Sequence, residues 1–326
     1  MHAERILDPE LPEAPMHLVL PGDPVIGRVV KNESCMRGKS ASYVHHIDID
    51  VSGTPLEGQF YAGQSFGVIA PGEDERGRTH AVRLFSIASP SAGEDGEGKI
   101  LSTTCKRFID EYKPQTPKDD QNKRGLFVGV CSNYLCDLAP GAEVQISGPN
   151  GKRFLLPTEP SNHDFLFLAT GTGIAPYRGM ILELLKGPNG PVSSEIHLVM
   201  GAAYNTDLLY DDTFRALADE FPNFYYHTVV SREIQSDPSQ GGYVHHYLDR
   251  QVQLHTGLLK NDRTLMYICG MAGMQLGVYQ LLTRLGLDGP FLTIKDELAD
   301  VDPADWELKQ IKRYVRPTHR CMLEVY

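Results

Sequence analysis

The chain has 326 residues, of which 41% are hydrophobic, and its 31 Lys and Arg against 42 Asp and Glu give a formal net charge of −11 with His neutral. This composition excludes a disordered chain and argues against a global nucleic-acid-binding surface, although a local basic patch stays open. No apolar run approaches the roughly 18 residues that a membrane-spanning helix needs. The length predicts two domains, either of which can bury a sizeable core.

Residues 1–21 are acidic and punctuated by proline, which predicts an extended arm. The same residues lack the apolar segment of a signal peptide and the Arg- and Ser-rich bias of a transit peptide. The six cysteines form no CxxC motif, and Cys131 and Cys136 have no partner pair at the spacing of a zinc site. We therefore expect a cytoplasmic protein with free thiols and without a metal or iron–sulfur centre.

From Pro24 to about Leu156, short apolar runs alternate with clusters of Gly, Pro and Asp. Strands at this spacing predict an antiparallel barrel or sandwich. Two polar stretches, 91–99 and 113–124, predict exposed loops. The predicted strands cover residues 25–30, 43–51, 65–71, 83–89 and 143–149.

The pattern changes near residues 158–163, after which apolar runs and helical patterns alternate. This alternation predicts a parallel sheet with helices on both faces. The predicted strands cover residues 165–170, 195–201, 223–231 and 264–270. The predicted helices cover residues 175–186, 211–221, 243–252 and 273–285, and Asp302-Pro303 predicts the start of another. The expected organisation is an N-terminal arm (1–21), a β domain (22–157) and an α/β domain (158–326).

Gly171, Thr172 and Gly173 lie between the end of a buried strand and the start of a helix. Glycines let the backbone approach a diphosphate, and a helix N-terminus supplies N–H groups and a favourable dipole. Pro176 sits early in that helix, where a missing N–H costs little. Taken alone, the segment also fits an ordinary glycine-rich turn.

Two further segments in the β domain have the same ambiguity. In the strand-like run 83–86, alternation places Arg83 and Phe85 on one face, where an aromatic ring can stack on a flat ligand while the guanidinium holds phosphate. Alone, this run also fits a surface strand with one core aromatic. Residues 129–135 predict a turn that feeds a short helix, with N–H groups for a second phosphate or with Ser132 as a cap.

In chain order, the segments RLFSIAS, GVCSNYLCDL, GTGIAP, CGMAGM and a terminal EVY closely resemble the plant-type ferredoxin–NADP reductase family. The resemblance runs from about Pro24 to Tyr326. It implies an antiparallel β-barrel that holds FAD, followed by a Rossmann-like α/β domain that holds NADP(H). It also implies an enzyme that moves hydride between NADPH and the flavin, and single electrons between the flavin and a ferredoxin or flavodoxin.

By motif match, the resemblance implies three groups of FAD contacts. Phe85 stands where the family usually has Tyr, so stacking is kept and one hydroxyl is lost. Lys106 would also reach the NADP diphosphate, and Tyr112 is the nearest candidate for stacking on the FAD adenine. The implied FAD contacts are Arg83, Phe85, Ser86, Thr104, Cys105, Lys106, Gly129, Val130, Cys131 and Ser132.

For NADP(H), the resemblance places the diphosphate at Gly171, Thr172 and Gly173. Ser231 and Arg232 match the segment that grips the 2′-phosphate, a role that suits a hydroxyl and a cation. The sequence departs from the family at two nearby positions, where Gly241 replaces a frequent Lys and His245 a frequent Gln. Tyr243 falls where the family stacks an aromatic ring on adenine.

The implied catalytic residues are Ser86, Cys269, Glu324 and Tyr326. In the family, the terminal Tyr stacks on the flavin and moves aside for nicotinamide, and Cys269 and Gly270 lie beside that site. Ser86 would hydrogen-bond near the flavin, and Glu324 would relay a proton or stabilise the flavin semiquinone.

Between Glu307 and Glu324 the chain has basic residues and no acidic one: Lys309, Lys312, Arg313, Arg316 and Arg320, with His319. We expect this 309–320 segment to dock a small acidic ferredoxin or flavodoxin, although it also fits a solvated helix face. No nucleic-acid partner and no membrane span are expected. Two other functions stay open: an NAD(P)H-dependent reductase component of an oxygenase or epoxidase system, and a non-catalytic, nucleotide-sensing flavoprotein subunit.

Overall fold

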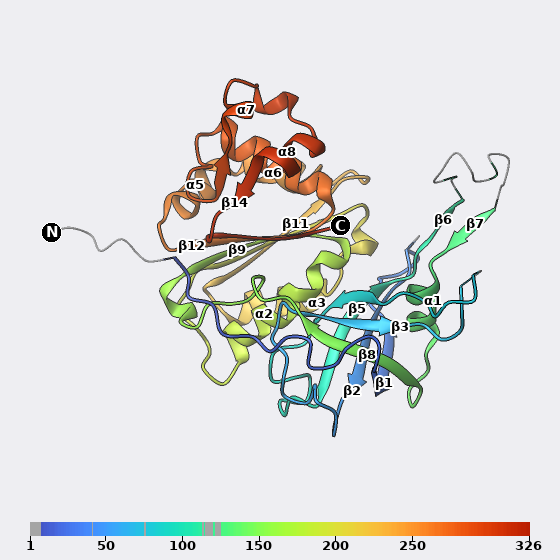
Figure 1. The fold of residues 1–326 in the computed structure, drawn as a ribbon. Helices are drawn as coiled ribbons and strands as arrows, with labels where there is room; N and C mark the ends of the chain where they lie inside the picture. Colours follow the sequence, from blue (N-terminus) through green and yellow to red (C-terminus); the bar gives the residue numbers. More distant parts are fainter. Residues whose placement is uncertain (1–7, 41, 75, 113, 115–119, 121–124) are drawn as a thin grey trace. The chain divides into compact units, whose positions relative to one another are not determined.

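The computed structural model describes residues 8–40, 42–74, 76–112, 114, 120 and 125–326. Figure 1 shows the chain, which divides into two compact units. The β unit contains Ala14–Met36 and Ser40–Gly151, and the α/β unit contains Met1–Glu13, Arg37–Lys39 and Lys152–Tyr326. Most of the predicted loop 113–124 lies outside the described residues. In the part of the chain that is described, no helix is long and apolar enough to cross a membrane.

The β unit is built on six antiparallel strands in the spatial order β4-β3-β8-β1-β2-β5. An isolated antiparallel bridge joins Ile87, just after β4, to Thr103 on β5. The two edges of the sheet therefore meet, which closes it into the predicted barrel. The strands are β1 (Val25–Ser34), β2 (Val44–Asp50), β3 (Ser65–Ile69), β4 (Arg83–Ser86), β5 (Ile100–Lys106) and β8 (Glu143–Asn150).

Alternation along the strands fills the interior of this barrel. On β2, Ile47 and Ile49 are fully buried and pack in the same core as Val29, Phe66 and Ile146. Outside the barrel sheet, β6 (Ile109–Glu111) and β7 (Leu126–Val128) form a separate antiparallel pair. The helix α1 (Val130–Asp137) follows β7 directly and packs against β5.

The α/β unit contains a five-stranded parallel sheet in the order β11-β10-β9-β12-β15. Figure 1 shows α2 and α3 on one face of this sheet and α5, α6 and α8 on the other. The strands are β9 (Asp164–Thr170), β10 (Ile196–Ala202), β11 (Phe224–Val230), β12 (Thr264–Gly270) and β15 (Cys321–Val325). The helices are α2 (Ala175–Lys186), α3 (Asp211–Glu220), α4 (Val244–Arg250), α5 (Val252–Lys260), α6 (Ala272–Arg284), α7 (Asp296–Ala299) and α8 (Leu308–Tyr314). Strands β13 (Leu292–Ile294) and β14 (Val315–Pro317) form a hairpin.

The strand order fixes where a ligand can bind. The chain runs outward from β9 to β10 and β11, then returns to the other side of β9 with β12 and β15. At such a reversal the loops after two neighbouring strands diverge and leave a crevice at the carboxyl ends of the strands. Both β9 and β12 are buried along nearly their whole length, which explains their continuous apolar runs.

The structure confirms the predicted two-domain fold, with differences in detail. Helix α5 was not predicted as a separate element. Pro303–Asp305 forms only a single 3-10 turn, in which the Asp302 side chain accepts a hydrogen bond from the Ala304 amide at 2.9 Å. Of the predicted arm, residues 8–21 are described, and they have no regular structure apart from a bridge between Val19 and Gly148.

Candidate active site

The turn after β9 fits tightly against the end of β12. Gly171 has a left-handed backbone with φ of +55°. A Cβ atom at Gly173 would lie 2.2 Å from the carbonyl oxygen of Cys269 and 2.7 Å from the amide nitrogen of Gly270. Only glycine allows the backbone of this turn to come so close to the neighbouring strand. The predicted diphosphate turn therefore lies at the reversal point of the sheet.

Cys269 and Gly270 lie at the end of β12, beside the turn after β9. Gly270 has φ of +136°, and a Cβ there would lie 2.2 Å from Thr170 Oγ1. The same hydroxyl accepts a hydrogen bond from the Met271 amide at 2.9 Å, which ties the ends of β9 and β12 together. Burial, and to a smaller degree the nearby Glu324 carboxylate, raises the pKa of the Cys269 thiol. Cys269 is therefore a neutral thiol at physiological pH.

The last strand brings the C-terminus to this crevice. In the parallel pairing of β15 with β12, Glu324 lies opposite Cys269 and Val325 opposite Gly270. The Tyr326 amide donates a hydrogen bond to Gly270 O at 3.0 Å, and the Tyr326 hydroxyl lies 2.8 Å from Thr172 Oγ1. The Tyr326 side chain is nevertheless 66% exposed. It is held at its backbone and hydroxyl while much of its ring stays accessible.

Among the titratable groups of this region, Glu324 has a pKa near neutrality. Burial raises the pKa of its carboxyl group to about 7. Both protonation states are therefore populated near neutral pH, which is the property that a proton-relaying acid or base requires.

The residues predicted for the 2′-phosphate lie at the end of β11. The amides of Ser231 and Arg232 donate to Ala202 O and Ala203 O at 3.0 and 2.9 Å, which fixes this loop beside the end of β10. Arg232 is exposed, and no carboxylate among the described residues forms an ion pair with its guanidinium. The adjacent Glu233 instead accepts a hydrogen bond from the Asn205 amide at 3.1 Å. A cation without a carboxylate partner beside a hydroxyl suits a phosphate ligand.

Tyr243 precedes α4 and offers a flat surface. Its side chain is 60% exposed and stacks on His245, with ring centroids 5.8 Å apart and an interplanar angle of 15°. The His245 ring packs on Gly277 of α6, where a Cβ would lie 2.2 Å from Nδ1. Burial lowers the pKa of His245 to about 4, so the ring is neutral. In sequence, His245 was only a departure from the family pattern; the structure shows that it supports Tyr243.

In the β unit, β4 carries the first predicted group of FAD contacts. Phe85 lies opposite Phe66 on β3, with ring centroids 6.4 Å apart, and is half-buried. The carbonyl of Ser86 accepts a hydrogen bond from Thr103 Oγ1 at 2.8 Å, which attaches β4 to β5. Arg83 is exposed and forms no ion pair within the described part of the chain.

The N-terminus of α1 is the second group. Gly129 precedes the helix, and no side chain caps it. The Ser132 hydroxyl instead accepts a hydrogen bond from the Phe108 amide at 3.1 Å. The first amides of α1 (Val130, Cys131 and Ser132) therefore suit an anionic ligand. Burial raises the pKa of the Cys131 thiol to about 11, and its side chain points to Val68 O at 3.7 Å rather than to solvent.

The third group, on β5, separates into different environments. Cys105 is fully buried and its Sγ lies 3.7 Å from Ser132 O, so its side chain positions the α1 turn. Thr104 is also buried, and only Lys106 is exposed.

Two aromatic residues that the sequence motifs did not point to lie at the β6–β7 pair, Phe127 within β7 and Phe108 directly before β6. Phe108 and Phe127 are about half exposed, at 47% and 50%, and their rings meet edge to face with centroids 5.8 Å apart. Tyr112, the predicted adenine-stacking candidate, is half-buried and donates its amide to Gly125 O at 2.9 Å. The apolar residues on both sides of the polar loop were the available signal for this surface.

The basic segment 309–320 is not uniform. Lys309, Lys312, Arg313 and Arg316 are exposed. Arg320 is different, because its guanidinium donates to Asn261 O at 2.6 Å and Thr264 O at 3.1 Å and lies over the Phe291 ring. Arg320 therefore stabilises the start of β12, and the exposed charge comes from the other four residues.

Comparisons with known proteins agree with this arrangement. Residues 167–280 match the family described as oxidoreductase NAD-binding domain. The chain is 33% identical over 317 residues to the ferredoxin–NADP reductase of Spirulina sp, which covers 96% of this chain and 99% of that protein. It is 36% identical over 278 residues to the chloroplastic root isozyme 1 of ferredoxin–NADP reductase from Arabidopsis thaliana, covering 84% of this chain and 71% of the relative. The solved structure of ferredoxin–NADP+ reductase from Plasmodium falciparum has the same fold, with a TM-score of 0.67 at 23% identity, over 95% of this chain and 99% of that one.

Proposed function

The chain belongs to the ferredoxin–NADP reductase family of FAD- and NADP(H)-dependent oxidoreductases, as the sequence motifs predicted, and we propose which of its residues bind FAD, bind NADP(H) and hold a proton. The observation that carries this proposal is the C-terminal strand. It places Glu324, with a pKa of about 7, opposite Cys269, and it ties Tyr326 to the Thr172 turn. When bound, FAD exchanges electron pairs with NADP(H) and single electrons with ferredoxin.

In the β unit, two groups fit the charged part of FAD. The exposed Arg83 guanidinium and the uncapped N-terminus of α1 both favour an anionic diphosphate. Phe85 offers a half-buried aromatic face from the same strand. Thr103 fixes the Ser86 backbone, so that Ser86 can present its hydroxyl as a hydrogen-bonding group. Cys105 contributes by positioning α1.

In the α/β unit, the glycine turn holds the NADP(H) diphosphate and Tyr326 controls access to the crevice. Admitting a nicotinamide ring requires the Tyr326 side chain to leave, which breaks its hydrogen bond to Thr172. Cys269 lines the crevice as a neutral thiol, and Glu324 holds or releases a proton at its carboxyl group.

We attribute preference for NADP(H) over NAD(H) to Arg232 with Ser231. The Tyr243–His245 stack provides the surface for the adenine ring. Because Gly241 has no side chain that could supply a second cation, Arg232 provides most of the discrimination between NADP(H) and NAD(H).

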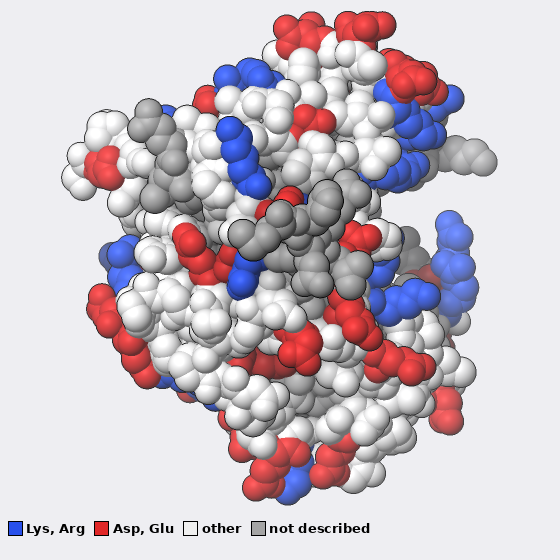
Figure 2. Space-filling view, turned by 90° about the vertical axis from the view of Figure 1, so that its left-hand side faces the viewer, with Lys and Arg blue, Asp and Glu red and all other residues white. Residues whose placement is uncertain are grey.

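The partner is ferredoxin, and we place its docking surface at the exposed basic residues of α8 and β14; flavodoxin is the alternative carrier. Figure 2 shows that charges of either sign gather in local patches on the face in view, so the net charge of −11 does not describe this face. Weak redox encounters depend on such local charge. We also place the enzyme in the cytoplasm, because all six cysteines are free thiols.

The decisive experiment measures reduction of several ferredoxins and flavodoxins by the purified yellow holoenzyme, driven by NADPH or NADH at several salt concentrations. We expect NADPH to bleach the flavin within seconds and ferredoxin reduction to fall as salt rises. Bleaching without reduction of any ferredoxin or flavodoxin would favour the oxygenase-reductase alternative. Absence of flavin or of bleaching would favour a non-catalytic subunit.

A further inference from the structure

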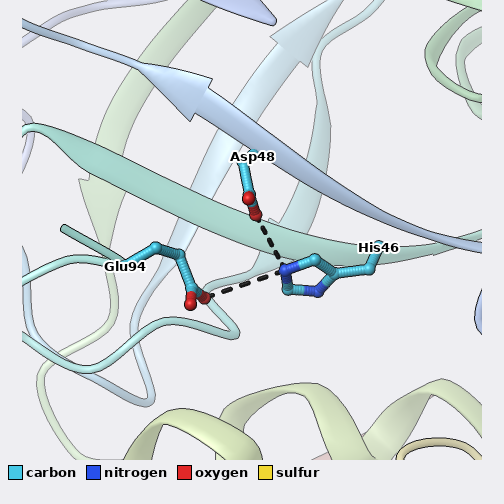
Figure 3. A group of neighbouring side chains, drawn as sticks. All are labelled: His46, Asp48 and Glu94. Atoms are coloured by element: carbon cyan, nitrogen blue, oxygen red, sulfur yellow. Dashed lines mark ion pairs between the residues drawn. The ribbon is translucent and has the colours of Figure 1, made fainter. Parts of the chain in front are cut away.

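Three side chains that the proposed electron transfer does not use converge in the β unit. Figure 3 shows His46 and Asp48 on β2 and Glu94 in the loop before β5, with their polar atoms directed toward one another. His46 Nε2 lies 2.7 Å from Asp48 Oδ1 and 3.8 Å from Glu94 Oε1. One possible ligand atom from each residue lies within 4.8 Å of the other two.

The local fold explains why these residues meet. Ile47 and Ile49 point into the barrel core, so His46 and Asp48 share the opposite face of β2. The Glu94 amide donates to Ile100 O at 2.8 Å, which folds the loop back onto β5. The hydroxyl of Ser102, which pairs with Asp48 in the β2–β5 register, donates to Glu94 Oε1 at 2.6 Å. Glu94 is therefore oriented by a neighbouring hydrogen bond.

Burial and charge make the cluster unusual. His46 and Asp48 are only 8% and 9% exposed. Asp48 Oδ1 is buried and has no hydrogen-bond partner within the described structure, although it lies within ion-pair distance of His46 Nε2. Lys31, which lies opposite Asp48 on β1, pairs instead with Glu33 at 3.1 Å. A buried carboxylate oxygen without a hydrogen-bond donor is costly, and a bound cation would compensate it.

We propose that His46, Asp48 and Glu94 bind a divalent transition-metal cation of the zinc type. One imidazole nitrogen and two carboxylate oxygens are a donor set that Zn²⁺ accepts, at bond lengths of about 2.0–2.2 Å. Two such ligands in tetrahedral geometry lie roughly 3.4 Å apart, between the 2.7 and 3.8 Å separations of this cluster. The cation coordinates Asp48 Oδ1, which has no hydrogen-bond partner, and attaches the 91–99 loop to β2.

The test is a zinc titration of the metal-stripped, FAD-loaded protein against a chromogenic chelator. We expect the wild-type chain to bind one Zn²⁺ at this site. We expect His46→Gln, Asp48→Asn and Glu94→Gln each to weaken that binding at least about tenfold, since each removes one ligand. Glu97→Gln is the matched control, because Glu97 lies in the same loop and pairs with Lys99. Equal affinity in the wild type and the three cluster variants overturns the proposal.

A second measurement on the wild-type protein does not depend on how the variants fold. X-ray absorption of the zinc-loaded chain should show only nitrogen and oxygen neighbours. Sulfur in the coordination shell would assign the ion to one of the six free cysteines and would reject this site.

Discussion

The two units hold their proposed ligand groups in different ways. In the α/β unit, the ends of β9 and β12 approach so closely that a Cβ at Gly173 or Gly270 would overlap atoms of the neighbouring strand. In the β unit, Arg83 and Phe85 project from β4 with their side chains partly open to solvent. The first region depends on backbone geometry and the second on side-chain chemistry. Substitutions should therefore act abruptly in the first region and gradually in the second.

The largest expected effect comes from Gly173→Ala. The new Cβ would lie 2.2 Å from Cys269 O, and neither backbone can yield without disturbing the β9–β12 pair. We expect NADPH-driven flavin reduction to fall by about 100-fold or more, with a loss of stability of roughly 1–3 kcal/mol. Stopped-flow absorbance and thermal unfolding measure the two quantities.

Gly257→Ala in α5 is the control for that substitution. Apart from its chain neighbours and the nearby backbone of its own helix, no atom lies within 4 Å of the Cβ that it would add, and the position is helical. We expect unchanged flavin reduction and a gain of about 0.5–1 kcal/mol in stability. Similar behaviour of the two variants would show that the β9–β12 approach is not tight.

Glu324→Gln tests the one strongly shifted carboxyl group of the crevice. The pKa of the Glu324 carboxyl group is about 7 in the folded chain and 4.5 in the unfolded chain. Between pH 4.5 and 7, the folded chain therefore holds a proton on Glu324 that the unfolded chain has lost. Its contribution to stability is present below pH 4.5 and is lost as the pH rises through 7. We expect Glu324→Gln to be more stable than the wild type above pH 7 but not below pH 5, as measured by thermal unfolding.

The same variant should slow turnover by about 100-fold and remove the inflection near pH 7 from the pH–rate profile. An inflection that persists in Glu324→Gln would assign the titration to another group.

Arg232→Ala should act on nucleotide choice. Loss of one charge-assisted interaction with the 2′-phosphate, worth about 1.5–3 kcal/mol, should raise KM for NADPH by roughly 10- to 150-fold. The KM for NADH should stay the same, because that nucleotide lacks the phosphate. Arg284→Ala, which removes an exposed arginine paired with Asp249 on another part of the unit, is the control. An equal rise in both KM values would show that Arg232 supports the loop rather than the phosphate.

The sequence predicted those secondary-structure elements whose positions follow from a local pattern of apolar residues. Apolar runs that end in glycine located β9 and β12, and strand alternation located β2 and β4. Contacts between distant residues were not predictable in this way: the Ile87–Thr103 bridge closes the barrel, and Arg320 caps the start of β12 instead of adding to the exposed charge. His46 and Asp48 have a readable i, i+2 spacing, but Glu94 joins them only through the folding of a loop. The cysteine spacing, which was the only metal signal considered in the sequence, had predicted no metal site.

The smallest expected effect is on partner docking, because exposed charges are screened by salt. Arg313→Glu with Arg316→Glu should lower the ferredoxin reduction rate several-fold at low salt and flatten its salt dependence, while NADPH-driven flavin reduction stays unchanged. The control is Lys186→Glu with Lys260→Glu, an equal charge change at the C-terminal ends of α2 and α5. If both double variants lower the rate equally, net charge governs the encounter. If only the first double variant lowers the rate, the partner binds through the local charge of α8 and β14. Docking would then depend on side-chain charge, although nucleotide binding in the same unit depends on backbone geometry.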